Sequence, residues 1–314
     1  MPENQPSAIS QKGLSVLITG GSGLIGKYLT SSLLSAGYSV SHLSRKIYQI
    51  EHVRVFLWDP EKRMIDPVSM EGVDFIIHLA GANIGARRWT RERKKEILES
   101  RTESARFLHQ TVTGRGIQLK AFISASASGI YGTETSEKIF SENDPAAGDF
   151  LGNVCKQWEE AADLFARSGI RTVKIRTAVV LEKNDSALSK LMKPGKFGFL
   201  VQTGTGLQYM PWIHIRDLCN IYLKAIEDSN MAGAYNAVAP QHVTHFNLMH
   251  VLAKIMRVSL IPVPVPGFVL KAVLGEMSDV ILYGSRVSSE KLINSGYRFR
   301  FKTIEAALDN VIRG

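Results

Sequence analysis

The sequence predicts an α/β fold, with a parallel sheet covered by helices on both faces (doubly wound) and a smaller, mostly helical C-terminal lobe. Two observations predict it. Short apolar, β-branched runs alternate with predicted helices of ten or more residues as far as about residue 180, which is typical of a doubly wound parallel sheet. Beyond that point the alternation loosens, and glycines, prolines and shorter helical stretches follow.

Strand and helix signals follow each other in the first part of the chain. Strands are expected at 14–19, 38–43, 53–58, 73–79, 121–126 and 171–175. The helices between them are expected at 27–36, 91–113 and 153–168. The first run, LSVLIT, is apolar throughout, as expected of a strand covered on both faces.

Weaker signals follow in the second part. Residues 182–208 carry four glycines between 195 and 206 and are interpreted as a mobile segment with a short helix at 187–192. A short strand at 211–215 precedes a helix ending at Ile226, for which Asp217 is the predicted N-cap. The remaining elements are a strand at 234–237 that returns to the main sheet, helices at 246–256, 268–274 and 304–312, and an extended proline-rich stretch at 261–266.

These elements predict two structural units. Residues 1–12 are polar and are interpreted as a disordered lead-in. Residues 13–182 form the predicted sheet domain, to which 212–240 return. Residues 183–211 and 241–314 form the predicted C-terminal lobe, which would hold a substrate against the sheet domain.

Composition excludes several classes of protein. The chain has 314 residues, of which 45% are hydrophobic and 21% charged, as in globular proteins. Only two cysteines occur, which excludes a disulfide framework and favours a cytoplasmic protein. No apolar run reaches the roughly 18 residues of a membrane span. The net charge of +9 suits an anionic ligand, and because no nucleic-acid recognition module is evident we expect neither nucleic acid nor membrane as partner.

The glycine-rich turn GGSGLIG at 20–26 is the strongest local signal. It directly follows the first predicted strand and opens the first predicted helix. In this arrangement Gly20 permits a tight turn, Gly23 lets the backbone approach a pyrophosphate, and Gly26 lets the helix pack closely on the strand. A pyrophosphate would meet the free N–H groups and the positive end of the helix. The pattern predicts a Rossmann-type dinucleotide site with contacts at Gly20, Gly23, Leu24, Ile25 and Gly26.

The end of the second predicted strand indicates which dinucleotide binds. Sites that prefer NAD place an acidic residue there for the ribose 2′-hydroxyl. This sequence has Ser44, Arg45 and Lys46 and no acid. A guanidinium can clamp a 2′-phosphate and a serine hydroxyl can donate to it. The predicted cofactor is therefore NADP.

Longer stretches carry a family resemblance. They are HLAGANI at 78–84, ESRTESA at 99–105, SASASGIYG at 124–132, PWIHIRDL at 211–218 and YNAVAP at 235–240. Together with the glycine-rich turn they resemble an atypical, extended short-chain dehydrogenase/reductase of the sugar-nucleotide-epimerase-like family with a small C-terminal domain of unknown function. The resemblance implies a small-molecule substrate and a homodimer. It also implies cofactor contacts at Ser44, Arg45, Leu79, Ala80, Glu96, Arg101 and Val180.

The resemblance further implies a tyrosine and, four residues later, a lysine for proton transfer, with a hydroxyl at the end of the fifth strand. Ser126 matches the hydroxyl and Lys156 the lysine, but Gly152 stands at the tyrosine position. Tyr131 is the candidate replacement as acid/base, with packing against its loop as the alternative. Lys156 either bonds the nicotinamide ribose or is a surface lysine.

His214, in PWIHIRD, is the candidate for orienting substrate, with a structural role as the alternative. No acidic cluster accompanies the C-terminal histidines, so no metal is expected. Two functions follow. One is an NADP-dependent epimerase or reductase that transfers hydride to or from a nucleotide-sugar-like or other hydroxyl or carbonyl substrate. The other is an NADP(H)-binding regulatory or sensor protein with little catalysis, because Gly152 cannot carry a proton.

Overall fold

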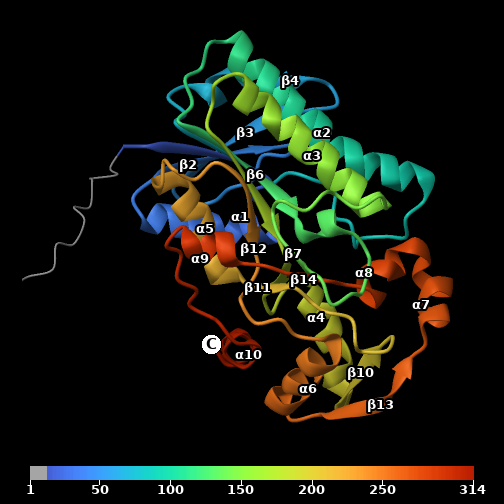
Figure 1. Cartoon of the computed structure of the whole chain (residues 1–314). Helices are drawn as coiled ribbons and strands as arrows, with labels where there is room; N and C mark the ends of the chain where they lie inside the picture. Colours follow the sequence, from blue (N-terminus) through green and yellow to red (C-terminus); the bar gives the residue numbers. More distant parts are fainter. Residues whose placement is uncertain (1–12) are drawn as a thin grey trace, which may run out of the picture.

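The computed structural model describes residues 13–314, so the predicted lead-in at 1–12 lies outside the described residues. An eight-stranded sheet forms the centre of the larger unit, with the order β12-β8-β6-β5-β1-β2-β3-β4 (Figure 1). Its strands are β1 (Ser15–Thr19), β2 (Ser39–Ser44), β3 (Val53–Asp59), β4 (Met64–Ile65), β5 (Phe75–His78), β6 (Ala121–Ala127), β8 (Thr172–Thr177) and β12 (Gly233–Ala237). Neighbouring strands are parallel, as the predicted doubly wound sheet requires, except that β3 and β4 are antiparallel.

Helices cover both faces of this sheet. On one face lie α1 (Leu24–Ser35) and α5 (Ile215–Glu227), and on the other α2 (Arg91–Gly114) and α3 (Phe150–Arg167) (Figure 1). Successive side chains of a strand point to opposite faces. Val16 and Ile18 accordingly belong to the core that contains residues of α1 and α5, whereas Leu17 belongs to the core beneath α2 and α3.

The chain changes direction within the sheet next to β1. From β1 it runs outward through β2 and β3, and then crosses back to β5 on the other side of β1. Thr19 pairs with His78 at the carboxyl ends of β1 and β5. In open α/β sheets ligands bind at such a switch point.

The C-terminal lobe has its own core. Its elements are α4 (Ala187–Met192), β10 (Phe199–Thr203), α6 (His245–Met256), β13 (Ser259–Val265), α7 (Gly267–Leu274), α8 (Asp279–Leu282) and α10 (Ile304–Arg313). α9 (Glu290–Asn294), although within 241–314, contacts β12 instead, and its Leu292 is buried in the core of the sheet domain. Leu200, Leu248, Leu252 and Leu308 are buried together in it. The segment 182–208, interpreted from the sequence as mobile with one short helix, also contains β10, which pairs in parallel with β13.

Short strand pairs join this lobe to the sheet domain. β9 (Val179–Leu181) pairs with β11 (Trp212–His214), and β7 (Ile139–Phe140) pairs with β14 (Arg286–Val287). Within the described part of the chain, no helix has the length and apolarity to cross a bilayer.

Asp217 does not have its predicted role as N-cap of α5. His214 caps that helix through Nδ1, which accepts from the Arg216 N–H at 3.1 Å. Asp217 lies inside the first turn, fully buried, and its carboxylate binds the segment at 297–301. A carboxylate in the first turn also suits the positive end of the helix.

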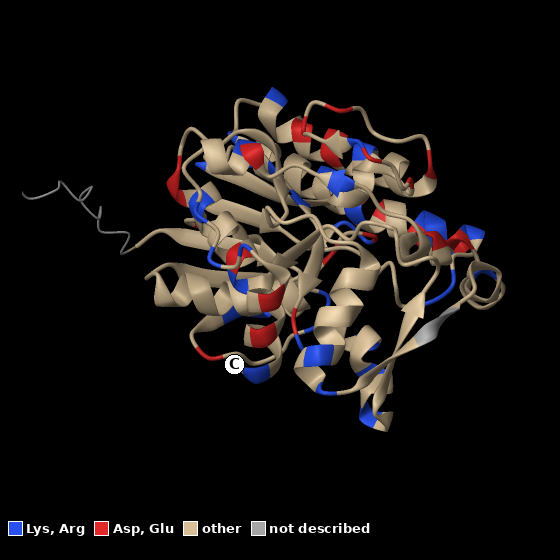
Figure 2. Cartoon of the chain, turned by 60° about the horizontal axis from the view of Figure 1, so that its bottom comes forward, with Lys and Arg blue, Asp and Glu red and all other residues tan. Residues whose placement is uncertain are grey.

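The charged side chains of α2 are largely paired with one another. Arg106 pairs with Glu103 and Lys95 with Glu99 along the helix. Figure 2 shows Lys and Arg in blue next to Asp and Glu in red over much of the surface. The exposed pairs of this helix are worth about 0.3–0.5 kcal/mol each, whereas Arg93 of the same helix is buried.

Candidate functional site

The phosphate turn, residues 20–26, has the conformation that its glycines predict. Gly20 has φ +73°, and the Gly23 N–H donates to the Gly20 carbonyl at 3.0 Å. A Cβ on Gly26 would lie 2.5 Å from the Gly20 oxygen, so only glycine allows α1 to start this close to the turn. Ser22 and Gly23 are exposed, and no side chain caps the helix. Its first N–H groups are available to an anion.

The residues that follow β5 pack against this turn. A Cβ on Gly20 would lie 3.0 Å from the Leu79 carbonyl carbon and the Ala80 nitrogen. The Ala80 N–H donates to Thr19 Oγ1 at 3.1 Å, and His78 Nδ1 lies 2.8 Å from the same oxygen. Burial lowers the pKa of His78 to about 4. His78 is therefore a neutral structural residue that joins the ends of β1 and β5.

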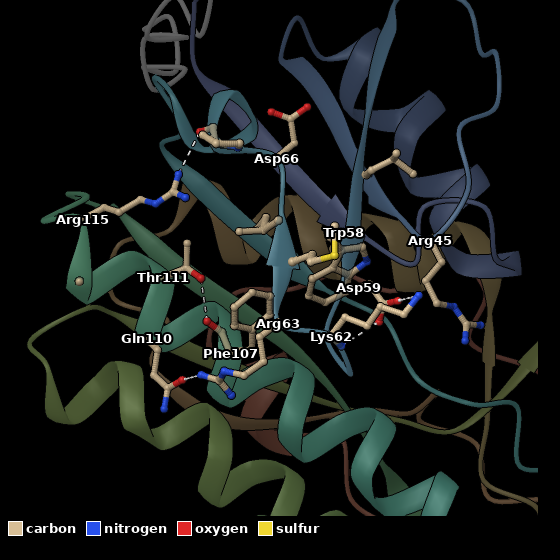
Figure 3. Close-up of a pocket in the computed structure, with 15 residues that line it drawn as sticks. Arg45, Trp58, Asp59, Lys62, Arg63, Asp66, Phe107, Gln110, Thr111 and Arg115 are labelled. Carbon is tan, nitrogen blue, oxygen red and sulfur yellow. Dashed lines mark hydrogen bonds and ion pairs between the residues drawn. The ribbon is translucent and has the colours of Figure 1, made fainter.

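Arg45 lies where the sequence predicts the 2′-phosphate contact, at the carboxyl end of β2. Ser44 is half-buried, whereas Arg45 and Lys46 are exposed. Arg45 stands on the rim of a depression of about 710 Å³ between β3, β4 and α2, beside the Asp59–Lys62 ion pair (Figure 3). Its guanidinium points away from the depression, toward the solvent.

Arg101 places a cation beside the loop that follows β5. A Cβ on Gly81 would lie 3.1 Å from the guanidinium carbon, which also stands 5.0 Å over the Trp158 ring. Arg101 Nη1 donates to the Ile97 carbonyl at 2.8 Å. Burial lowers the pKa of Arg101 to about 10, so the group stays cationic at neutral pH.

Two other predicted cofactor contacts have protein partners. Glu96 forms ion pairs of 2.7 Å with Arg87 and with Arg93, and these lower the pKa of its carboxyl. Val180 lies in the middle of β9, where it pairs with Ile213. Both contacts stay predictions.

Ser126 and Tyr131 are brought together, but inside a closed polar network. The Tyr131 hydroxyl donates to Asn236 Oδ1 at 2.7 Å and accepts from Arg176 Nη1 at 2.9 Å. Arg176 forms two bonds to Glu159, of 2.8 and 3.0 Å, and Ser126 Oγ donates to Glu159 at 2.7 Å. All five residues are buried, and burial raises the pKa of Tyr131 to about 12.

The position of the missing tyrosine is closed by main chain. A Cβ on Gly152 would collide with the Ala147 carbonyl oxygen. That segment is fixed, because the Ala147 N–H donates to the Ile130 carbonyl at 2.8 Å and Asp149 caps α3 by accepting from the Gly152 N–H at 2.8 Å. Lys156 lies one turn further along and is exposed.

His214 lies in packing between α5 and the C-terminal segment. Besides capping α5, its ring stacks on Phe301 with 3.8 Å between centroids, and it is 2% exposed. Burial lowers its pKa to about 4. This placement matches the structural alternative for His214, and a role in orienting substrate stays a prediction.

The side chains that sequence reasoning missed are Glu159 and Arg176. No sequence motif contains them, because one lies on α3 and the other on β8, and the two side chains meet only in the folded chain. Among residues 13–314, no group of three or more His, Cys, Asp or Glu side chains is arranged to hold a metal ion.

Comparison with known proteins decides the family. The model of the family described as NAD dependent epimerase/dehydratase matches residues 16–150. The model of a domain of unknown function, DUF1731, matches residues 265–311. Epimerase family protein YfhF of Bacillus subtilis is 34% identical over 304 residues, covering 95% of this chain and 98% of its own. This chain belongs to the epimerase family. The resemblance predicted from its motifs is confirmed, including the C-terminal domain.

Solved structures agree with this epimerase-family fold. The crystal structure of human epimerase family protein SDR39U1 (isoform 2) with NADPH has a TM-score of 0.83 and 28% identity, covering 96% of this chain and 99% of that one. A nucleoside-diphosphate sugar epimerase from Corynebacterium glutamicum has a TM-score of 0.75 and 31% identity. The match covers 95% of this chain and 58% of the longer epimerase from C. glutamicum.

Proposed function

We propose that this epimerase-family chain binds NADP(H), with the pyrophosphate at the first turn of α1 and the 2′-phosphate at Arg45. The observation that carries the proposal is the phosphate turn, which presents uncapped N–H groups after β1, while the exposed Arg45 follows the neighbouring parallel strand β2. The NADPH in the SDR39U1 crystal structure supports the same cofactor. Leu79, Ala80 and Arg101 line the same end of the sheet, as expected for contacts with the adenosine half.

Titration calorimetry with NADPH and NADH tests this proposal. We expect the wild-type chain to bind NADPH more tightly, and Arg45→Ala to weaken NADPH about tenfold or more while changing NADH little, because a charge-assisted contact is lost. Arg115→Ala is the matched control, since Arg115 lies at the other end of the same depression and donates to the Pro67 carbonyl. Equal binding of both dinucleotides by the wild-type chain would refute the role of Arg45.

Of the two functions that the sequence leaves open, we propose NADP(H) binding with little turnover. The Ala147 carbonyl lies where a catalytic tyrosine side chain would start, and Tyr131 has its hydroxyl in a buried network. A phenol must reach the reacting proton to act on it. A bound dinucleotide would then act as a signal of redox state or as a structural ligand.

Hydride transfer on a nucleotide-sugar-like substrate is the second candidate, because the matched family is one of epimerases and dehydratases. Lys190 of α4 donates to the Gly85 carbonyl at 2.9 Å, which places a lysine of the C-terminal lobe over the loop after β5. An anionic substrate between the two units would meet this charge. A homodimer through α2 and α3 also stays a prediction.

The two candidates are distinguished by turnover. The chain is incubated with NADPH or NADP and a panel of UDP-sugars and small carbonyl compounds. Nicotinamide absorbance reports net reduction or oxidation, and NMR of the sugars reports epimerisation, which returns the hydride to the sugar and leaves the absorbance unchanged. The binding proposal expects no change above a buffer control although the dinucleotide is bound. Sustained turnover that disappears in Tyr131→Phe would overturn it in favour of the Tyr131 mechanism.

A further inference from the structure

Tyr48, which none of the predicted contacts includes, joins the loop after β2 to the phosphate turn. Its half-buried hydroxyl lies 2.7 Å from His42 Nδ1, and Ser22 of the turn is near enough to oppose the rise in the pKa of Tyr48 that burial causes. His42 is fully buried near the end of β2. A Cβ on Gly21 would lie 2.5 Å from the His42 ring, so the ring stands directly against the main chain of the turn.

The directions of these hydrogen bonds follow from Thr30 in α1. The Thr30 hydroxyl donates its one proton to the Gly26 carbonyl at 2.7 Å, so it can only accept from His42 Nε2, 2.8 Å away. Burial lowers the pKa of His42 to about 4, so the ring is neutral and Nδ1 is an acceptor. The Tyr48 hydroxyl must then donate to Nδ1.

The resulting chain of bonds has one direction, from Tyr48 through His42 and Thr30 to the Gly26 carbonyl in the first turn of α1. It cannot reverse, because the only proton on Thr30 is committed to Gly26. Tyr48 is thereby fixed to the turn in one orientation. Arg45 lies three residues earlier in the same loop and is exposed, so its position depends on how that loop is held.

We infer that Tyr48 is a positioning residue for cofactor choice. Its hydroxyl holds the loop that carries Arg45 at a fixed distance from the phosphate turn. That distance lets one NADP(H) place its pyrophosphate at the turn and its 2′-phosphate at Arg45. This inference rests on the proposed NADP(H) binding and adds a second determinant to Arg45. Fixing a side chain in its bound position strengthens binding because less motion is lost when the ligand arrives.

Tyr48→Phe removes only the hydroxyl and tests the inference by calorimetry. We expect NADPH to bind about fivefold more weakly and NADH to change less, so the preference for NADPH falls. Adenosine 2′,5′-bisphosphate should lose affinity in parallel with NADPH, whereas 5′-AMP should not. Tyr28→Phe is the matched control, because this tyrosine of α1 donates to Glu182 at 2.8 Å and lies outside the proposed contacts.

A double-mutant cycle separates positioning from general stability. In the Arg45→Ala background, Tyr48→Phe should add no further loss for NADPH, because its effect passes through Arg45. An unchanged NADPH-to-NADH preference in a folded Tyr48→Phe chain, or an additive loss in the double variant, would overturn the inference. If the wild-type chain bound neither dinucleotide, the proposed function itself would fail, which is a separate result.

Discussion

At Gly152, packing accounts for the absence of the tyrosine that the family resemblance places there. The first turn of α3 and the loop before it touch through main-chain atoms there, and Asp149 and Ile130 hold that loop in place. Glycine is therefore required by packing at the position where related enzymes would need a phenol. Restoring the standard tyrosine would require the loop itself to move.

Gly152→Tyr should destabilise the chain without creating activity. Overpacking against a fixed backbone costs typically about 1–3 kcal/mol, so we expect a loss of this size in the free energy of urea unfolding. NADPH turnover should stay at the wild-type level. Asn153→Tyr is the control, since this neighbour on the same helix is exposed and should cost little. A stable Gly152→Tyr protein that gains turnover would contradict the packing argument.

Other site residues differ in how far the sequence could predict them. Gly20, Gly26 and Arg45 lie where their motif predicts, because a strand, a turn and a helix that are adjacent in sequence fix them. The roles of Tyr131 and His214 depend on Arg176 and Phe301, which are brought to them only by the folded chain. No pattern of spacing marks such partners.

At the scale of elements, long periodic segments were predictable and short paired ones were not. The strand at 121–126 and the helix at 91–113 appear as β6 and α2 with nearly the predicted bounds. β7 and β14 are two residues each and exist only because they pair with each other. β10 lies in a segment rich in glycines. Gly204 and Gly206 have positive φ and form the turn that follows the strand, and the Gly206 carbonyl accepts from the Phe246 N–H of α6 at 2.9 Å.

The first turn of α5 binds the C-terminal segment through Asp217. Its carboxylate accepts from the Tyr297 hydroxyl at 2.9 Å and from the backbone N–H groups of Arg300 and Phe301 at 2.8 and 3.0 Å. The segment it holds leads directly into α10. One buried side chain of the sheet domain thus connects α5 to the last helix of the lobe.

Asp217→Asn should weaken this connection, because the amide NH₂ would face a backbone N–H that needs an acceptor. A buried donor without a partner costs about 1–3 kcal/mol, which we expect in the free energy of unfolding. Amide hydrogen exchange should rise first in α10. Arg216→Ala, at an exposed neighbour, should change stability by less than about 0.5 kcal/mol. Unchanged exchange in α10 would show that other contacts hold the helix.

For the whole molecule, buried histidines stand at the joints between elements. His42 joins β2 to α1, His78 joins the ends of β1 and β5 to α2, and His214 stacks between α5 and the C-terminal segment. His245 binds Thr203 and so joins α6 to β10. Burial is the main cause that lowers the pKa of each to about 4.

This arrangement predicts loss of stability in mild acid. Above pH about 6.5 these histidines are neutral in both the folded and the unfolded chain, and they do not change the free energy of unfolding. Between pH about 6.5 and about 4 the unfolded chain binds protons that the folded chain does not, so stability falls as pH falls, by up to about 1.4 kcal/mol per pH unit for each group. The loss ends below the folded-state pKa values.

Urea unfolding at a series of pH values between neutral and mildly acidic measures this loss. His245→Gln should reduce the slope of stability against pH by up to one proton, because one buried group no longer titrates. Asn247→Gln, at an exposed residue of the same helix that does not titrate, is the control and should leave the slope unchanged. A stability that stays constant from neutral pH to pH about 5 would mean that the buried rings accept protons in the folded chain, and the bond directions assigned to His42 and Tyr48 would then have to be revised.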